Sequence, residues 1–190
     1  YSLDYGIALP NQPDVETKEY SRTYIWNEKN QLKSSVENGF VVQYRYGEDG
    51  QRAVKSSLNG ETLYFNNMWQ MSTTAMGMRQ TKHIFVGETR IATKNNWWQD
   101  ASTDYEQYNT YYYHSDHLGS AQLITDYKGQ EYERIEYTPY GELWIEKVKK
   151  GFESINYRFT GKEMDSETGL YYFGARYLDS KYSRWLSTDP

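Results

Sequence analysis

The feature that most constrains the fold of this chain is a strand-turn-strand pattern that recurs every 20 residues. Successive units begin at Tyr24, Tyr44, Tyr64 and Ile84. The units place Gly or Asn where a tight turn needs a positive φ, as in the turn at 48–51. A single hairpin cannot bury its apolar face alone, so the units are expected to join into one continuous sheet.

Asn-Gly pairs separate the units at 38–39 and 59–60. Asn-Gly between alternating strands is the strongest short hairpin signal, so these pairs predict tight connections. We assign degenerate hairpin repeats to residues 21–110. Residues 1–20 contain two prolines and little periodicity, which indicates an irregular lead-in.

The period breaks over residues 92–110, where two tryptophans, Trp97 and Trp98, stand side by side in the sequence. This stretch is either a surface loop that exposes both indoles or an edge insertion that packs them. Large exposed apolar patches are uncommon unless they are functional, so packing is the simpler interpretation.

Aromatic residues carry most of the burial that this chain can achieve. The chain has 190 residues with 21 Tyr, 6 Trp and 6 Phe. Each aromatic ring can bury roughly 150–250 Å², and Tyr favours strands. The composition therefore predicts an all-β chain with a Tyr-rich core.

Charge and composition exclude several classes of function. The net charge of −5 argues against nucleic acid as a partner, because phosphate binding needs clustered Lys and Arg. The chain has no Cys, so it has neither disulfides nor a Cys-based zinc site. No apolar run approaches the ~20 residues of a membrane span. The chain begins without Met or a signal peptide and stops at Asp-Pro, so we expect a piece of a longer protein. The absence of Cys suits an exported protein.

The last part of the chain, from Arg158 to Pro190, predicts a set of short hairpins. We expect a strand that ends at Phe159, a polar turn over 161–169 and an aromatic strand over 170–177. A second turn at 179–183 would then lead to the final residues.

Residues 111–142 form a second block of Tyr-rich strands and turns. The spacer that follows is less regular. Glu142, Glu146 and Lys150 stand at four-residue spacing there, which indicates one short helix.

Both blocks resemble the RHS repeat-associated core of bacterial RHS/YD-repeat proteins. The core pattern YxHxDHLGSxxxxTDxxGxxxxxxxYxPFGE fits residues 111–142. The pattern RFTGKExDxETGLYYxxARYYDPxxGRFLSxDP fits residues 158–190. Its matched residues are 158–163, Asp165, 167–172, 175–177, Asp179, Arg184, 186–187 and 189–190. Departures from the second pattern are Leu178 for Tyr, Ser180 for Pro, Ser183 for Gly and Trp185 for Phe.

The units at Tyr24 and Tyr44 resemble YD repeats, whose pattern is roughly Y-x-Y-D-x-x-G-R. Asn27 and Gly47 replace the Asp, and Gln31 and Gln51 replace the Arg, so the repeats are degenerate.

This resemblance implies an all-β fold in which repeated hairpins wind into a spiral sheet or partial shell that is closed by the core. The core would occupy residues 111–190 and be cut short at its C-terminal end. The implied function is mechanical, since the shell would enclose and present a C-terminal effector. The implied partners are this effector, which would be a toxin domain, the upstream repeats and a chaperone or delivery apparatus. The implied location is secreted or cell-surface.

His114, Asp116 and His117 form a cluster that could ligate a metal. In a strand, the first two residues face one way and His117 the other, so three convergent ligands would need a turn. Without Cys or a third nearby His, a hairpin corner is the simpler interpretation. We predict no metal site and no cofactor.

Arg176 and Asp189 are the candidate catalytic residues. By the resemblance, they hold the places of the Arg and of one Asp in an aspartyl autoproteolytic centre, whose second Asp lies further downstream. Two close carboxylates share a proton and can act as base and acid on a peptide bond. The chain would then hold an incomplete half-site without enzyme activity of its own. The other interpretation of the pair is a structural ion pair.

A function of a different class is a carbohydrate- or cell-wall-binding module, since aromatic hairpin repeats also bind glycans. Such modules carry Trp and Gly at fixed places in every repeat. Trp26 has no Trp counterpart at Tyr46 or Asn66, which weakens this alternative.

Overall fold

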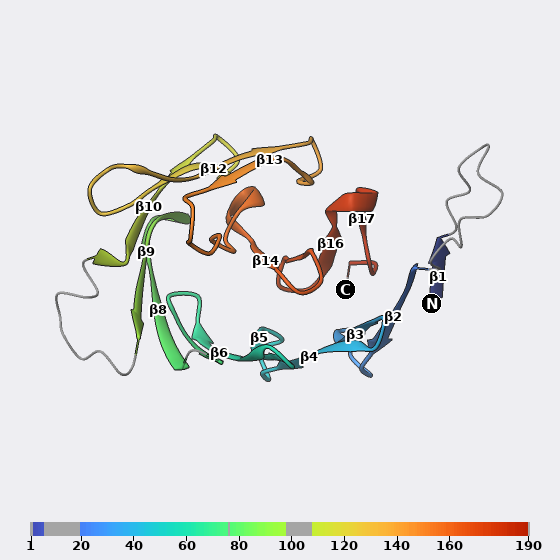
Figure 1. The fold of residues 1–190 in the computed structure, drawn as a ribbon. Coiled ribbons are helices and arrows are strands. Elements are labelled where there is room, and N and C mark those ends of the chain that lie inside the picture. The colour runs from blue at the N-terminus through green and yellow to red at the C-terminus, as the bar shows by residue number, and fades with distance from the viewer. Residues whose placement is uncertain (1, 6–19, 76, 98–107, 190) are drawn as a thin grey trace.

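The large sheet is an antiparallel meander in which 13 strands pair in the order of the sequence (Figure 1). The computed structural model describes residues 2–5, 20–75, 77–97 and 108–189. Each strand pairs with its neighbours in sequence, as the repeated hairpin pattern predicts. The strands are β1 Ser2–Tyr5, β2 Tyr20–Trp26, β3 Leu32–Glu37, β4 Phe40–Tyr46, β5 Arg52–Ser57, β6 Gly60–Asn66, β7 Trp69–Thr74, β8 Gly77–Val86, β9 Thr89–Trp97, β10 Thr110–Ser115, β11 Ala121–Thr125, β12 Glu131–Tyr137 and β13 Leu143–Val148.

A second sheet of four strands, here called the inner sheet, is formed by the last part of the chain. In Figure 1 the large sheet bends round like a letter C, and the inner sheet lies inside the bend. Its elements, with two short 3₁₀ turns, are η1 Phe159–Gly161, β14 Glu163–Asp165, β15 Leu170–Tyr172, β16 Tyr177–Asp179, η2 Ser180–Tyr182 and β17 Arg184–Trp185. The prediction of an all-β chain whose hairpins wind into a partial shell is confirmed.

The turns of the large sheet repeat one hydrogen-bonding scheme. At Asn27, Asp116 and Asp126, the backbone N–H donates to the carbonyl oxygen four residues later, each time at 2.9 Å. The side-chain Oδ1 of the same residue accepts the N–H groups two and four positions later. The third residue after each has a positive φ, in Asn30 (57°), Gly119 (82°) and Gly129 (75°). The Asp-x-x-Gly part of the repeat is thus a side-chain-capped turn with a left-handed third position.

The unit at Tyr44 keeps this turn although Gly47 stands in place of the capping residue. The Gly47 N–H donates to the Gln51 carbonyl oxygen at 2.9 Å. Asp49 Oδ1 accepts the Gln51 N–H at 3.0 Å, so the capping carboxylate has moved two positions along the turn. The degenerate repeat therefore retains its geometry.

The connections between units are two-residue turns, as the Asn-Gly pairs predict. Asn38 and Gly39 have φ values of 48° and 81° and lie between the paired residues Glu37 and Phe40. Positive φ at both positions is the type I′ turn that suits twisted strands. At the next connection Ser57 pairs with Gly60, so the turn begins one residue before Asn59.

Two apolar clusters lie between the large sheet and the chain that it encloses. The first joins β2–β4 to the inner sheet, and its buried members are Tyr24, Leu32, Val42, Tyr44, Leu170 and Tyr177. The second joins β10–β12 to the segment before η1, and its buried members are Tyr111, Ala121, Ile124, Tyr132, Ile135 and Ile155. Tyr rings supply much of both clusters, as the composition predicts.

Three predictions for the C-terminal hairpins are wrong. The polar turn predicted over 161–169 contains the strand β14. The chain does not end a strand at Phe159. It turns there, and Thr160 and Gly161 have φ values of 48° and 67°. The stretch 170–177 is not one strand, because a turn with Gly174 at φ 85° separates β15 from β16. The aromatic run conceals this turn, which folds Tyr172 back to pair with Tyr177.

The predicted helix over Glu142, Glu146 and Lys150 is also wrong. This segment is β13, which pairs along its length with β12. Backbone pairing with a formed strand outweighs the few tenths of a kcal/mol that i,i+4 charge pairs give a helix. Glu146 instead makes an ion pair with Arg158.

Among the described residues no helix is long and apolar enough to cross a bilayer. Trp97 ends β9, and the Arg79 guanidinium lies 5.7 Å from its ring centroid. Trp98 and most of the predicted insertion lie outside the described residues, as does most of the predicted lead-in.

The capped turn gives a direct test of this fold. Asp116→Ala removes the acceptor of the Leu118 and Ser120 N–H groups. We expect the free energy of unfolding, measured by urea denaturation, to fall by about 1–2 kcal/mol. Asp116→Asn keeps the acceptor oxygen and should stay within about 0.5 kcal/mol of the parent. Equal stability of the two variants would show that the capping oxygen does not hold the turn.

Candidate functional site

The inner sheet brings Arg176 and Asp189 together. The turn before β16 is closed by the Phe173 N–H, which donates to the Arg176 carbonyl oxygen at 2.9 Å. β17 then returns antiparallel to β16, and the Leu186 N–H donates to the Tyr177 carbonyl oxygen at 3.0 Å. The two candidate residues therefore meet at one end of this hairpin.

Arg176 and Asp189 form an ion pair in which Nε lies 2.9 Å from Oδ1. The Arg176 side chain is 23% exposed and that of Asp189 is 72% exposed. An ion pair this open to water contributes at most about 1 kcal/mol to stability. The arrangement presents a carboxylate to solvent with a guanidinium fixed beside it. The two residues are thus in contact, and their catalytic role stays a prediction.

The three residues of the candidate metal cluster have separate places. Asp116 caps its own turn, while the exposed His114 lies with Nε2 3.2 Å from Thr125 Oγ1. His117 is exposed at the tip of the same turn. In the part of the chain that the structure describes, no three His, Cys, Asp or Glu side chains are placed to hold a metal ion.

A buried charge network joins the inner sheet to the large sheet. Arg52 of β5 places Nη2 2.7 Å from Glu163 Oε2 and Nη1 2.7 Å from Asp165 Oδ2. Its side chain is 1% exposed. The guanidinium also lies 4.7 Å from the Tyr64 ring centroid and 4.4 Å from that of Tyr172. One cation thus satisfies two carboxylates of β14 inside an aromatic enclosure.

Lys55 extends the network along β5. Its Nζ lies 3.3 Å from Asp165 Oδ1 and 2.9 Å from Glu167 Oε2. Burial alone would raise the pKa of Asp165, but the Arg52 and Lys55 cations hold that pKa below its ordinary value. Asp165 therefore stays ionised although its side chain is fully buried.

A second buried ion-pair network lies just before the inner sheet, at Arg158. Arg158 Nη2 lies 2.9 Å from Glu133 Oε1 on β12 and also pairs with Glu146 on β13. The other oxygen of Glu133 accepts the Ile155 N–H at 2.8 Å. These contacts fix where the chain leaves the large sheet and turns inward.

Polar side chains of β7–β9 contact the residue before Arg158, which is Tyr157. Tyr157 donates its hydroxyl to Gln70 Oε1 at 2.6 Å, and the Arg90 guanidinium lies 3.6 Å from the Tyr157 ring centroid. His83 packs edge-on against this ring. Burial, with Arg90 nearby, lowers the pKa of His83 to about 2, so this His is neutral.

Sequence reasoning missed these networks, although one signal was present. Glu163, Asp165 and Glu167 alternate in the sequence, and alternate residues of a strand lie on one face. Carboxylates that are buried on one face of a strand require cations opposite them, and Glu167 continues the series in the turn after β14. Nothing in the sequence, however, selects Arg52 and Lys55 as those cations.

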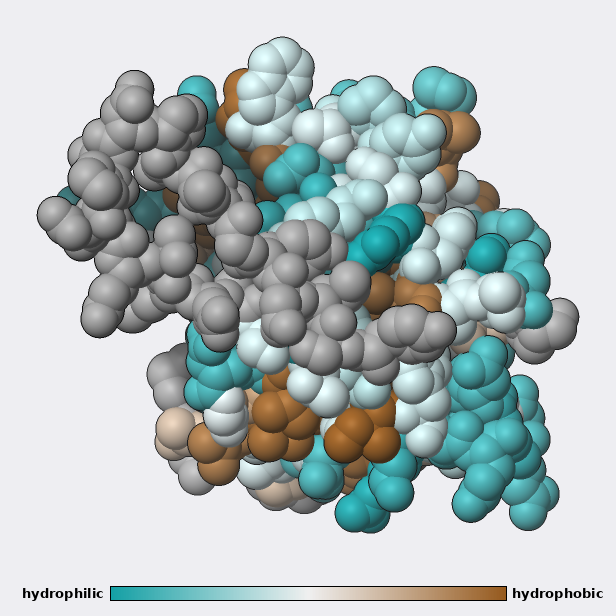
Figure 2. All heavy atoms as spheres, turned by 90° about the vertical axis from the view of Figure 1, so that its right-hand side faces the viewer, coloured by the Kyte–Doolittle hydropathy of each residue, from teal (hydrophilic) through white to brown (hydrophobic). Residues whose placement is uncertain are grey.

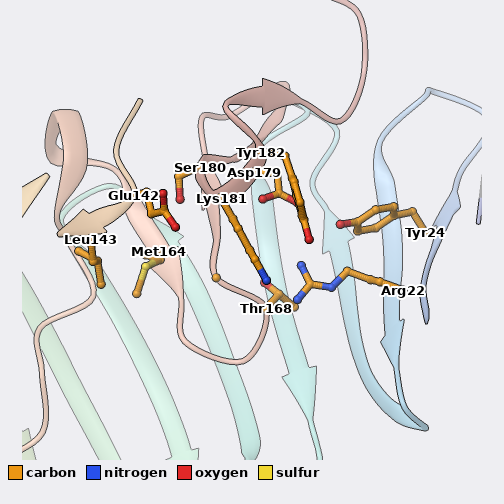
Figure 3. A pocket seen from close by; sticks show the side chains of 11 residues that line it. Arg22, Tyr24, Glu142, Leu143, Met164, Thr168, Asp179, Ser180, Lys181 and Tyr182 are labelled. Atoms are coloured by element: carbon orange, nitrogen blue, oxygen red, sulfur yellow. The ribbon is translucent and has the colours of Figure 1, made fainter. Parts of the chain in front are cut away.

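A cavity of about 290 Å³ lies where the two ends of the large sheet approach the inner sheet (Figure 3). Arg22 and Tyr24 of β2 point across it toward Asp179 and Tyr182 (Figure 3). Burial raises the pKa of Asp179, and the nearby Arg22 opposes this shift. The remaining lining residues are Glu142, Leu143, Met164, Thr168, Gly169, Ser180 and Lys181.

The open side of the C-shaped sheet has a mixed surface. Viewed from that side, the described surface is largely hydrophilic or intermediate in hydropathy, with small apolar areas near its lower edge (Figure 2). The cavity has the same character, since cations, carboxylates, Tyr rings and Met164 all line it. This side therefore offers hydrogen bonds and charge along with apolar contact.

Comparisons with known proteins agree with this architecture. Residues 103–190 match the Teneurin YD-shell family. The chain is 26% identical over 174 residues to the tRNA3(Ser)-specific nuclease WapA of Bacillus spizizenii, a match that covers 88% of this chain and 7% of WapA. It is 27% identical over 189 residues to the toxin subunit YenC1 of Yersinia entomophaga, covering 89% of this chain and 19% of YenC1.

Solved structures of toxin complexes share the fold. The crystal structure of TcdB2-TccC3-TEV matches with a TM-score of 0.71 and 27% identity, over 89% of this chain and 9% of the other. The Photorhabdus luminescens Tc holotoxin pore matches with a TM-score of 0.72 and 26% identity, again over 89% and 9%. The chain thus spans less than a fifth of the length of these relatives.

The buried ion pairs of Arg52 predict that replacing this one residue lowers the stability of the fold strongly. Arg52→Leu leaves Glu163 and Asp165 buried without this cation, and we expect it to lower the free energy of unfolding by about 3–5 kcal/mol. Arg134→Leu is the matched control, because Arg134 is 48% exposed in its ion pair with Glu131. It should change the urea midpoint little, because this ion pair is open to water. Equal losses in the two variants would contradict a special role for the buried ion pairs.

The lowered pKa of Asp165 predicts acid sensitivity. Because its folded pKa lies below the ordinary value of 3.8, Asp165 contributes stability that is present above that pH. This contribution is lost as the pH falls through the lower folded pKa, since the unfolded chain then binds more protons. Urea midpoints between about pH 5 and pH 2.5 should therefore fall more steeply in the parent than in Asp165→Asn. Parallel curves would rule out this linkage.

Proposed function

The chain belongs to the RHS/YD-repeat family as a segment of a YD-shell, and from this premise we propose that it forms part of the wall that encloses a C-terminal effector. The observation that carries the proposal is the placement of the inner sheet. The large sheet bends round it, buried charges join the two sheets at Arg52, and Arg158 just before the inner sheet pairs with Glu133 of the large sheet. A wall that holds its own following chain on the concave side is suited to enclose a domain of the same polypeptide.

The position of the described C-terminal end supports this role. The end of the trace lies inside the bend of the large sheet, beside the inner sheet (Figure 1). Residues that follow Asp189 would therefore start from the concave side. In this proposal residues 21–110 are hairpin repeats that follow a lead-in at 1–20, and residues 111–190 are the core that closes the wall.

We further propose that Arg176 and Asp189 form half of a self-cleaving aspartyl site. A second carboxylate, contributed by chain that follows, would share a proton with Asp189. The ionised member would take a proton from water as the water oxygen attacks the scissile carbonyl, and the protonated member would give its proton to the leaving nitrogen. Arg176 would hold Asp189 in place through the 2.9 Å contact. The chain described here has no enzyme activity in this proposal.

The proposed partners follow from the same architecture. They are the effector domain, upstream repeats that extend the large sheet and a chaperone or delivery apparatus. The proposed location is secreted or cell-surface, in line with the toxin subunits and toxin complexes among the relatives. The proposal needs no metal or cofactor, and the net charge of −5 does not suit nucleic acid.

The carbohydrate-binding alternative gains no support from Trp26 or Trp97. Trp26 packs against the first apolar cluster, so its ring serves burial. Trp97 contacts Arg79, and Trp98 lies outside the described residues.

Intact mass of the natural polypeptide, extended through any residues that follow this chain, tests the proposal. We expect two masses, from a cut a short distance after Pro190, and a single uncut mass for Asp189→Asn. After cleavage, the released piece should co-elute with the shell in gel filtration, because it is enclosed.

The control for this experiment is Asp49→Asn, which keeps its capping oxygen in a distant turn and should be cut like the parent. Normal cutting of Asp189→Asn would remove the proteolytic assignment and leave the shell. Separate elution of the released piece would instead count against enclosure.

A further inference from the structure

One side chain next to the Arg176–Asp189 pair has no assigned role. The Arg176 guanidinium carbon lies 4.0 Å from the centroid of the Trp185 ring. At this distance the cation lies over the indole face, and Trp is the aromatic side chain that attracts a cation most strongly. Arg176 thus has two partners, the ring that it lies over and the carboxylate that its Nε–H meets.

The indole of Trp185 is itself held in place. Its backbone belongs to β17, where Trp185 pairs with Leu178 of β16. Phe173 packs edge-on against the ring, with 4.8 Å between centroids and 86° between planes. Ser183, at φ 54°, turns the chain from η2 into β17. The ring is therefore a fixed platform, although 38% of Trp185 is exposed.

We infer that Trp185 is a positioning residue that acts through Arg176. A guanidinium donates only in its own plane, so a ring that fixes this plane also fixes the direction of the Nε–H toward Asp189. This matters because Asp189 is exposed, and an open ion pair otherwise samples many geometries. The inference rests on the proposed self-cleavage, since it gives Trp185 a role in that same site.

The sequence agrees with this assignment. Position 185 carries Trp where the pattern that the chain resembles carries Phe. Phe offers a smaller and weaker cation-binding face, so Trp at this place strengthens the hold on Arg176. Trp185 touches neither a reacting bond nor a proton in this scheme, and its effect passes through the guanidinium.

Self-cleavage rates of the natural polypeptide test the inference. We expect Trp185→Phe, which keeps a ring, to cut within about threefold of the parent, and Trp185→Leu to cut about tenfold more slowly. In an Arg176→Lys background the Leu substitution should add little, because the group that the ring orients is gone. Trp144→Leu is the control, since this exposed Trp lies on β13, and it should cut like the parent.

A second readout does not depend on cleavage. The Nε–H proton NMR signal of Arg176, assigned by its loss in Arg176→Lys, should be shifted upfield by the indole. It should keep part of that shift in Trp185→Phe and lose it in Trp185→Leu. The circular dichroism spectra of the variants should match that of the parent. If the Leu variant does not fold, the partial loss of the shift in Trp185→Phe is the test.

The outcomes separate the two proposals. If Asp189→Asn stops cleavage while Trp185→Leu cuts at the parental rate, the positioning role is wrong and the proposed function stands. If Asp189→Asn is cut normally, the proposed proteolysis fails, and the positioning role fails with it whatever the NMR signal shows. Slowing by Trp185→Leu that persists undiminished in the Arg176→Lys background would also overturn the inference.

Discussion

The guanidinium of Arg52 is the contact on which the arrangement of the two sheets depends. The guanidinium makes ion pairs with Glu163 and Asp165 of β14. The backbone N–H of Arg52 also donates to the Tyr172 hydroxyl at 2.7 Å. Burying these charges costs desolvation energy, so the network is weak support for a large net gain in stability. Its value is in specificity, because any shift of β14 along β5 would leave a buried charge without a partner. The register of the inner sheet, and thus the place of every residue after it, follows from this one cation.

The sequence predicted the parts of the fold that depend on local chemistry. The tight turns of the repeats, the connection at 38–39 and the hairpin corner at Asp116 follow from the residues that form them, although the capping by Asn27 and Asp116 was not predicted. The strand order then follows, since each hairpin pairs with the next. The failures lie where distant contacts decide. The segment 143–148 is a strand because β12 stands beside it, and 170–177 divides into two strands because the hairpin must pack under β4.

The candidate site divides in the same way. Arg176 and Asp189 could be named because a short hairpin separates them and the core motif places both. The partners of the inner sheet could not be named, because Arg52 is 111 positions from Glu163 and 113 from Asp165. Alternating carboxylates on a buried face need cations opposite them. Which of the 21 Lys and Arg residues lie there depends on the curvature of the large sheet. That curvature is a property of 13 strands together and of no single segment.

The two sheets therefore differ in what must already be folded before each can form. Every pairing in the large sheet joins sequence neighbours, so its hairpins can form one after another as the chain lengthens. The inner sheet binds Arg52 on β5, and the residues just before it bind Gln70 on β7 and Glu133 on β12. These three partners come together only when the large sheet has bent round. Arg176, Trp185 and Asp189 all belong to the chain that this docking orders. If the pair cuts the chain as proposed, cleavage is coupled to closure of the wall, because the same buried charges that hold the inner sheet also place the residues that would do the cutting.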